Sequence, residues 1–548
     1  MNAPLEAKHF RCPISLRWSI AIGASLRIVF IAAKPLQIDE CWTFFVSTDD
    51  ASLWTNTTFE TAYDSHPFLF YALYRSLADL ITSSAWMFRL PVAAFSIATL
   101  FAYRAFLKAT DLPDQIVRWS MLLFSVLPAN VFYAYDARAY SLAQLVGISV
   151  LLSYLAYRQT PTMQRFIALA LCVGFSCTFD VIGLSPVIAI GLDACYLLTF
   201  GKDRAVHWRS LKTILVGGLL ALPYLALRWQ QYQSTGQADQ YAKPFSPMTF
   251  VDNMTQLSPF GVGQLHIESL PGQMATYIVI ASLTILVWLA GVSFSIRARL
   301  PVYRLCWALV LPPFLGQLYF LLTTGGAPMH RRYLLVIVAG LVPILVAGAM
   351  EISRLRQELF GDGSFMQRAG HLQRIGFLLV LPFAVSVIMS VRLGGRADWQ
   401  ALYQKISPEI RETDGVLNMY ASPAPGFVAS PLTTYAYMDG KRLARENFLE
   451  SFVNVDRDNI VSLSDPQDWG KPEDHTAAMK FVQSFAGRRV WTFRTPLIEG
   501  LEYDLAPIGQ LQESWTANGL EAKLFVIPSN SSNTDTFTDQ TSLAQPAR

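Results

Sequence analysis

Two adjacent carboxylates, Asp39 and Glu40, directly follow the first apolar segment of the chain. Ile38 stands on one side of the pair and Trp42 close on the other. Because neighbouring like charges repel and an apolar surround disfavours ionisation, a carboxylate here is suited to accept a proton. The pair would also suit the start of an ordinary helix, since carboxylates are favoured at helix N-termini.

Other polar groups fall near the ends of apolar segments. Ionisable groups at such positions are costly, and by default they indicate a site that faces a polar cavity. Each also has a structural explanation: a helix start at a proline, an arginine anchored at the interface, an arginine pair on lipid headgroups, or a solvated span end. The groups are Asp64-Ser65-His66-Pro67, Tyr135-Asp136-Ala137-Arg138-Ala139-Tyr140, Asp180, and His330-Arg331-Arg332-Tyr333.

Together these residue types suit a transfer reaction to a hydroxyl group. A carboxylate can accept the proton of the hydroxyl nucleophile. Arginines can hold a phosphate through paired hydrogen bonds and stabilise the charge that it gains as a leaving group. Aromatic side chains such as Trp42, Phe45 and Tyr71 can stack on a sugar ring or line a lipid groove.

The composition indicates a membrane protein. Of the 548 residues, 52% are hydrophobic and 15% charged, whereas soluble proteins carry about 25% charged residues. A net charge of +3 is too small to indicate a nucleic-acid partner. The six cysteines show no zinc-site spacing, and none follows Cys306, so the polar C-terminal region has no disulfide framework.

Runs of about 20 mostly apolar residues predict about eleven membrane spans. The first includes Arg27 and is too long for a signal peptide, so we expect it to be retained. The segment 66–84 is interrupted by Arg75 and Asp79 and is predicted to lie along the interface. The spans lie near 14–34, 89–108, 116–135, 138–157, 164–182, 183–201, 211–229, 273–296, 302–323, 333–351 and 375–393.

Lysine and arginine are concentrated in alternate loops, which predicts a cytoplasmic N-terminus. The basic loops include residues 202–212, 297–304 and 354–374, and the loops between them are richer in acids. With an odd number of spans, residues 394–548 lie outside, and every polar cluster named above falls at or near the outer face. The long polar loop 230–272 also lies outside and has the length of a functional loop.

The fold class predicted is a multi-span α-helical membrane protein with a C-terminal soluble α/β domain. The transmembrane domain is residues 1–393 and the α/β domain residues 394–528. A helix is expected at 398–412, and strands at 415–420, 489–493 and 522–527. Residues 529–548 contain almost nothing apolar and are predicted to be a disordered tail.

Over about residues 14–400, the chain resembles bacterial GT-C glycosyltransferases of the protein O-mannosyltransferase and aminoarabinose transferase type. The resemblance rests on the order and spacing of short motifs. Phe68 stands where the family has a second proline, and Asp136 stands where it has glutamate. The motifs are Ile38-Asp39-Glu40-Cys41-Trp42, His66-Pro67-Phe68-Leu69-Phe70-Tyr71, Arg89-Leu90-Pro91-Val92, Asp136-Ala137-Arg138-Ala139-Tyr140 and Arg332-Tyr333.

The resemblance implies an inverting enzyme of the bacterial inner membrane. It would move a sugar from a polyprenyl-phosphate carrier to an acceptor outside the cytoplasm, with Asp39 as general base and Glu40 in support. Arg138 and Arg332 would hold the carrier phosphate. The expected donor-binding set is Asp64, His66, Arg138, Tyr140, Asp180, Arg331, Arg332 and Tyr333. Some relatives bind a divalent metal near the first outer loop, and Asp64, His66 and His266 are of ligand type, but no ligand set is assigned.

Other functions stay open at this point. A non-enzymatic transporter of lipids or lipid-linked sugars is the main alternative, although the broken helix pairs and internal repeats typical of transporters are not recognisable. A catalytically silent relative is a third reading. The phosphate-binding glycine loops of nucleotide-dependent enzymes are absent from the sequence, which favours a lipid-linked donor. The acceptor could be lipid A or lipopolysaccharide, another envelope glycan, or a protein.

Overall fold

A computed structural model describes the chain in stretches. These are residues 12–31, 36, 38–48, 68–201, 203–235, 273–298, 300–324, 335–360, 399–411, 413–418, 460–462, 482–494, 509–517 and 520–529. The chain divides into two compact units. The first comprises residues 1–33, 51–76 and 89–394, and the second residues 34–50, 77–88 and 395–548.

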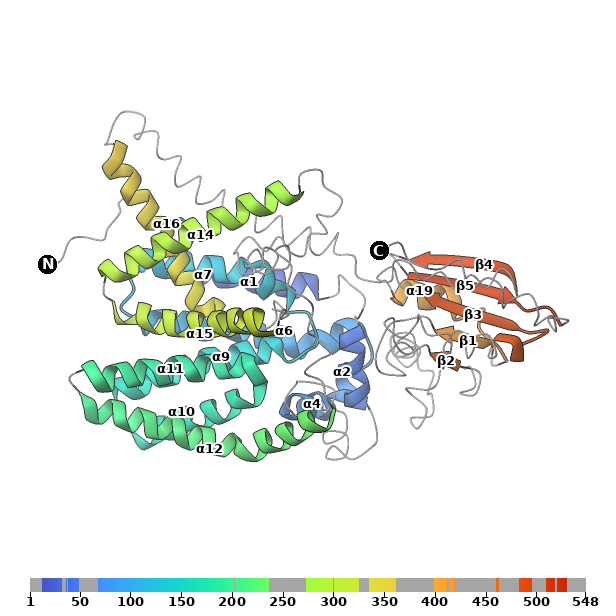
Figure 1. Cartoon of the computed structure of the whole chain (residues 1–548), viewed down its shortest axis with the longest axis horizontal. Helices are drawn as coiled ribbons and strands as arrows, with labels where there is room; N and C mark the ends of the chain where they lie inside the picture. Colours follow the sequence, from blue (N-terminus) through green and yellow to red (C-terminus); the bar gives the residue numbers. More distant parts are fainter. Residues whose placement is uncertain are drawn as a thin grey trace. The chain divides into compact units, whose positions relative to one another are not determined.

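The first unit is helical (Figure 1). Its helices begin with side-chain caps where the sequence offers them: Ser15 accepts a hydrogen bond from the Trp18 amide, and Thr162 accepts one from the Arg165 amide. The helices are α1 (Leu16–Phe30), α4 (Phe68–Ser76), α6 (Ala85–Lys108, which begins in the second unit), α7 (Asp114–Val126), α8 (Pro128–Phe132), α9 (Tyr140–Gln159), α10 (Met163–Ser176), η1 (Cys177–Phe179), α11 (Asp180–Phe200), α12 (Arg204–Thr235), α14 (Gln273–Ala298), α15 (Pro301–Thr324) and α16 (Val338–Phe360).

Every predicted span from 14–34 to 333–351 overlaps a helix, and 375–393 lies outside the described residues. Three of the described helices are long and apolar enough to cross a membrane: Ala85–Lys108, Tyr140–Gln159 and Ile182–Phe200 within α11. The predicted span 116–135 was wrong as one helix, because α7 ends at Val126 and α8 begins at Pro128. The interfacial segment 66–84 likewise forms two short helices, α4 and α5 (Ala78–Ile81).

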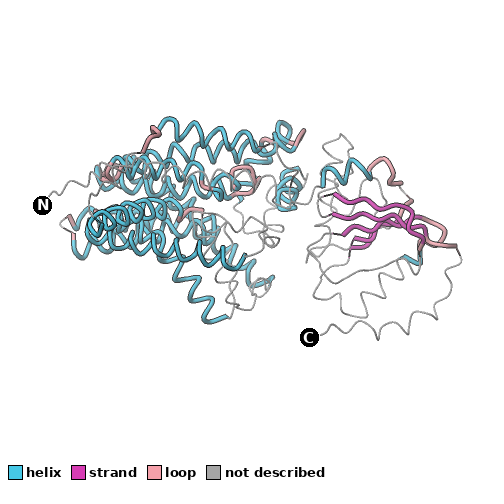
Figure 2. Tube along the Cα trace, turned by 90° about the horizontal axis from the view of Figure 1, so that it is seen from above, coloured by secondary structure: helices cyan, strands magenta, loops and turns pink. Residues whose placement is uncertain are grey.

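The helices of the first unit pack as a continuous series of neighbours. α10 contacts α9 and α12, and α11 contacts α9, α12 and α15. α15 then contacts α16, which also packs against α14 and α7, and α7 packs against α1. Figure 2 shows these helices running side by side as one bundle. Helix α9 therefore has partners on several sides, and more than half of its residues are buried.

Two glycines let α14 and α16 come close together. A Cβ on Gly291 would lie 2.5 Å from the Ile344 carbonyl oxygen, and a Cβ on Gly348 would lie 2.0 Å from that of Val287. Real Cβ atoms cannot approach a carbonyl so closely, so the contact requires glycine on both helices. Small residues at such crossings are typical of helices that pack within a membrane.

The second unit contains a mixed β-sheet. Its described strands are β1 (Gly415–Asn418), β2 (Ile460–Ser462), β3 (Arg489–Arg494), β4 (Gln510–Ala517) and β5 (Leu520–Val526), in the order β2-β1-β3-β5-β4. β1 is parallel to β2 and β3, whereas β5 is antiparallel to β3 and β4. Figure 2 shows the strands together in magenta. Asn518-Gly519, the pair that favours a two-residue hairpin, joins β4 to β5 in the sequence.

The predicted strands at 415–420, 489–493 and 522–527 correspond to β1, β3 and β5. The predicted helix at 398–412 is shorter, as α19 (Trp399–Ile406). One buried carboxylate organises this part: Asp414 accepts bonds from Arg489 Nη2 and from Trp491 Nε1, each at 2.8 Å. The second unit also contains α2 (Ile38–Thr48). That residues 394–528 form an external domain stays a prediction.

Candidate active site

A break between two helices builds the candidate site. α7 ends at Val126, Leu127 is extended with ψ of 125°, and Pro128 opens α8. Proline has no amide hydrogen and a fixed φ, so it suits a first helical turn but cannot continue the hydrogen-bond ladder of the preceding helix. The break therefore leaves carbonyl groups at the end of α7 without helical partners.

Side chains from other helices bind two of these carbonyls. Asn130 Nδ2 donates to the Phe124 oxygen at 2.9 Å. Arg27 Nη1, from α1, donates to the Ser125 oxygen at 2.9 Å. Arg27 Nε also donates to Ser96 Oγ of α6 at 2.7 Å, so this fully buried guanidinium joins α1, α6 and α7. Cations are favourable at the C-terminal end of a helix dipole, so Arg27 supports the break electrostatically as well.

The turn between α8 and α9 carries Arg138. The Arg138 amide donates to the Asp136 carbonyl at 2.6 Å, forming a three-residue turn centred on Ala137. Ser141 Oγ donates to the Tyr133 carbonyl at 2.7 Å and closes the longer loop. The sequence places a turn between two spans here; a connection between two helices is found, but the helix before it is the five-residue α8.

Both charged side chains of this turn are enclosed by protein. Asp136 is 8% exposed and Arg138 7% exposed. An arginine that anchors the protein by reaching to the interface would show its guanidinium to solvent or lipid. The burial of Arg138 therefore argues against the anchor interpretation and leaves a role inside the protein.

Aromatic rings enclose the same turn. Tyr140, the first residue of α9 and 3% exposed, packs edge-on against Tyr133 at 5.1 Å between ring centroids. Phe132 packs against Tyr133 and Tyr135 at 5.1 and 5.5 Å. Such edge-on pairs stabilise their surroundings beyond simple area burial. The turn is thus held by rings as well as by hydrogen bonds.

A chain of amide hydrogen bonds links this turn region to a more distant part of the sequence. Gln144 Nε2 donates to Asn130 Oδ1 at 2.9 Å and to the Leu335 carbonyl at 2.7 Å. Gly147, one turn further along α9, has no room for a side chain, because a Cβ there would lie 2.5 Å from Val336 Cγ1. Helices α8 and α9 and residues 335–336 therefore form one tightly packed frame.

The other predicted site residues are less completely described. Asp39 and Glu40 lie in the first turn of α2, and Glu40 is fully buried. Asp180 is the first residue of α11. The side chains of Asp39 and Asp180 are not among those described, so the distance from Asp39 to Arg138 stays a prediction. The residues that lie outside the described part of the chain are Asp64, His66, Arg331, Arg332 and Tyr333.

A metal ion would need several histidine, cysteine or acidic side chains close together. Within the described stretches, no three histidine, cysteine or acidic side chains gather closely enough to hold a metal ion. Asp64, His66 and His266, the ligand-type residues of the predicted outer loops, all lie beyond those stretches. The described residues therefore supply no metal ligand set, and a divalent metal stays an open expectation.

Three residues that the structure makes prominent, Asn130, Gln144 and Asp193, carry only weak signals in the sequence. Asn130 and Gln144 are uncharged amides inside apolar segments. Single polar residues of this kind are common in membrane helices, so they do not stand out in the sequence. Asp193 stands alone as a carboxylate in the predicted span 183–201. A single charged residue within an apolar span was the sequence feature that could have indicated a role for Asp193.

The helical bundle and this frame define the fold class, a multi-span helical membrane protein. Two crystal structures of ArnT from Cupriavidus metallidurans match the chain over 93% of its length and 97% of theirs, with TM-scores of 0.52. One is in the apo state, at 11% identity, and the other is bound to undecaprenyl phosphate, at 12% identity. The likeness confirms the expected helical membrane fold, while the number of spans and the external position of residues 394–528 stay predictions. No family model and no curated protein sequence matches the chain.

Proposed function

We propose that the chain is an inverting glycosyltransferase that moves a sugar from a polyprenyl-phosphate carrier to an extracytoplasmic acceptor. The observation that carries this proposal is the fold shared along 93% of the chain with an ArnT structure that holds undecaprenyl phosphate. The buried Arg138 turn supports it, because an enclosed guanidinium is suited to a phosphate that has left water.

In the proposed reaction, the acceptor hydroxyl oxygen attacks the anomeric carbon of the sugar. The bond between that carbon and the phosphate oxygen breaks, and the carrier leaves as polyprenyl phosphate. Asp39 takes the hydroxyl proton, with Glu40 beside it in the first turn of α2. Arg138 and Arg332 stabilise the charge that gathers on the departing phosphate. Attack opposite the leaving group inverts the anomeric configuration.

Other residues of the expected donor site would complete the carrier and sugar contacts. They are Asp64, His66, Tyr140, Asp180, Arg331 and Tyr333. In this proposal the protein lies in the bacterial inner membrane, with the active site and residues 394–528 in the periplasm. The acceptor is lipid A or lipopolysaccharide, another envelope glycan, or a protein.

The test compares envelope lipids, glycans and proteins by mass spectrometry in cells with and without the gene. A sugar-sized mass difference on an acceptor is expected. Complementation with Asp39→Asn should lower transfer by about 10²–10⁴-fold, the usual contribution of a general base. Asp203→Asn is the matched control, since Asp203 is exposed and precedes α12.

Membrane fractions must contain equal amounts of each variant, which separates loss of chemistry from loss of insertion. Undiminished transfer by Asp39→Asn would contradict the assignment of the base. Movement of an intact lipid-linked sugar, without its covalent transfer to any acceptor, would instead support the transporter alternative.

A further inference from the structure

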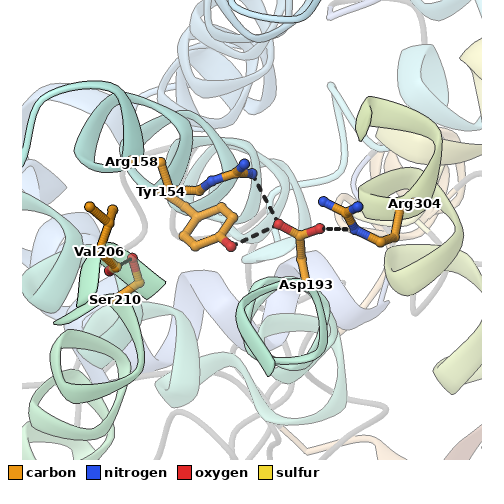
Figure 3. A network of polar contacts seen from close by, with 6 residues as sticks. All are labelled: Tyr154, Arg158, Asp193, Val206, Ser210 and Arg304. Atoms are coloured by element: carbon orange, nitrogen blue, oxygen red, sulfur yellow. Dashed lines mark hydrogen bonds and ion pairs between the residues drawn. The ribbon is translucent and has the colours of Figure 1, made fainter. Parts of the chain in front are cut away.

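Asp193 of α11 lies between two arginines at the end of α9 that is distant from the candidate site (Figure 3). Its Oδ1 accepts from Arg304 Nε of α15 at 2.5 Å, and its Oδ2 accepts from Arg158 Nη1 of α9 at 3.0 Å. Tyr154 Oη of α9 also donates to Oδ2, at 2.8 Å. The Asp193 side chain is completely buried. One carboxylate therefore joins three helices.

This cluster is separate from the Arg138 turn. Tyr140 and Arg158 stand near opposite ends of α9, about 27 Å apart along the axis at 1.5 Å per residue. None of the residues that bind Asp193 takes part in the hydrogen bonds around Asn130 and Gln144.

Two acidic residues, Asp193 and Asp203, act on His207 together with the two arginines. Two guanidiniums face one carboxylate, and their side chains are 23% and 27% exposed. Each is also held over an aromatic ring: Arg158 over Tyr154 at 5.4 Å and Arg304 over Tyr196 at 4.5 Å. The ring contacts and the bonds to Asp193 therefore hold each guanidinium in place. Part of each arginine side chain stays exposed, and some of its N–H groups have no acceptor in the described part of the chain.

Several buried nitrogens in the cluster have no hydrogen-bond partner among the described residues. They are Arg158 Nε, Arg304 Nη2 and His207 Nδ1. His207, in the first turns of α12, is only 7% exposed. Its imidazole is close enough to Asp193, Asp203 and both arginines for their charges to act on it. Buried polar groups are nearly always hydrogen-bonded, so three such nitrogens on residues of this cluster leave hydrogen-bonding capacity for a ligand.

Two helices also begin here. α12 starts at Arg204 and α15 at Pro301, so His207 and Arg304 each lie in the first turn of their helix. The N-terminal end of a helix carries partial positive charge and amide groups without helical partners. In Figure 3, Tyr154 lies between Val206 and Ser210 of α12 on one side and Asp193 and Arg304 on the other. The starts of α12 and α15 therefore add donors and partial positive charge to those of the two arginines.

We propose that Arg158, Arg304 and His207 bind a phosphate group, carried either by free phosphate or by a lipid headgroup. Phosphate offers several acceptor oxygens, as donors arriving from three helices require, and arginine forks match it well. The proposal does not depend on the glycosyltransferase function.

The test uses the purified full-length chain and two phosphate probes. Inorganic phosphate is titrated calorimetrically in detergent, and phosphatidylglycerol nanodiscs are compared with phosphatidylcholine nanodiscs by native mass spectrometry. Wild type should bind at least one probe. Arg158→Gln and Arg304→Gln should weaken binding by about tenfold or more, since each removes a charged donor. Binding of free phosphate identifies a soluble ligand, and retention of phosphatidylglycerol alone identifies a lipid headgroup.

Arg165→Gln is the matched control. Arg165 starts the neighbouring helix α10 and donates to the Ala156 and Thr160 carbonyls instead of to Asp193. It should bind phosphate as wild type does. His207→Gln leaves the ion pairs of Asp193 intact, so it tests the phosphate site if an arginine variant does not fold. Phosphate binding that is weakened by about threefold or more in this variant supports the site. Absence of saturable binding by wild type, or equal weakening by Arg165→Gln, overturns the proposal.

Discussion

The two ends of α9 are fixed by different chemistry. At the Tyr140 end, neutral groups bind one another: Gln144 joins Asn130 to the Leu335 carbonyl. At the other end, Asp193 is buried between the charged side chains of Arg158 and Arg304. Both networks join several helices, but the first is made of neutral amides, whereas the second buries a carboxylate between two arginines.

The difference teaches where the protein can tolerate change. A neutral amide costs little to bury once its hydrogen bonds are made. Removing it leaves one or two buried groups without a hydrogen-bond partner. A buried carboxylate is costly to remove from water and depends on its cations, so losing it leaves charges uncompensated. We therefore expect a graded set of effects, from the ionic end to the neutral end.

The largest effect is expected for Asp193→Asn. It leaves two guanidiniums close together without their carboxylate, and breaking a buried ion pair usually costs about 3–5 kcal/mol. The partial exposure of both arginines should keep the loss near the lower figure. Thermal denaturation in detergent measures it, with Asp111→Asn, at an exposed residue between α6 and α7, as the control. A stability change no larger than that of the control would contradict the comparison.

Gln144→Leu should cost about 1–3 kcal/mol, because the Leu335 carbonyl and Asn130 Oδ1 both lose their donor inside the protein. Denaturation of this variant alongside Asn130→Ala and the double variant measures the coupling. The double variant should lose less than the sum of the single losses, since the two side chains share one bond. Strict additivity would show that the amides act independently.

Ser141→Ala should cost about 0.5–1.5 kcal/mol through loss of the bond to the Tyr133 carbonyl across the loop. Ser149→Ala provides the matched control, since its hydroxyl bonds the Leu145 carbonyl within the same helix. The control should change the denaturation midpoint less. Equal shifts of the denaturation midpoint in the two variants would mean that the bond across the loop stabilises the protein no more than a bond within a helix does.

The smallest effect concerns pH at the ionic end. Burial lowers the pKa of His207 below its ordinary 6.5, and the Arg158 charge lowers it further. As the pH falls below about 6.5, the folded protein therefore binds fewer protons than the unfolded chain, and its stability decreases. Above about pH 6.5 the stability that neutral His207 contributes is fully present. His207→Gln should make the denaturation midpoint less sensitive between pH 5 and 7. An unchanged pH profile would show that His207 keeps its ordinary pKa.

Sequence patterns predicted the Arg138 turn because local chemistry determines it. A short polar run between two apolar segments has few ways to connect them, and Arg138 is found in such a connection. The same reasoning treated 116–135 as one span, although Pro128 stood within it. Membrane helices often tolerate proline, as α6 does at Pro91, so the residue type alone did not predict the break.

The sequence by itself determined the helical membrane class, most helix positions, the strands β1, β3 and β5, and the position of Arg138 between two helices. These follow from apolar run length, alternation and local charge, which act over a few neighbouring residues. Only the tertiary structure decided that Asp193 meets Arg158 and Arg304, and that Gln144 meets Leu335. Those partners are 35 to 191 residues apart in the chain, and only helix packing brings such groups within hydrogen-bond distance.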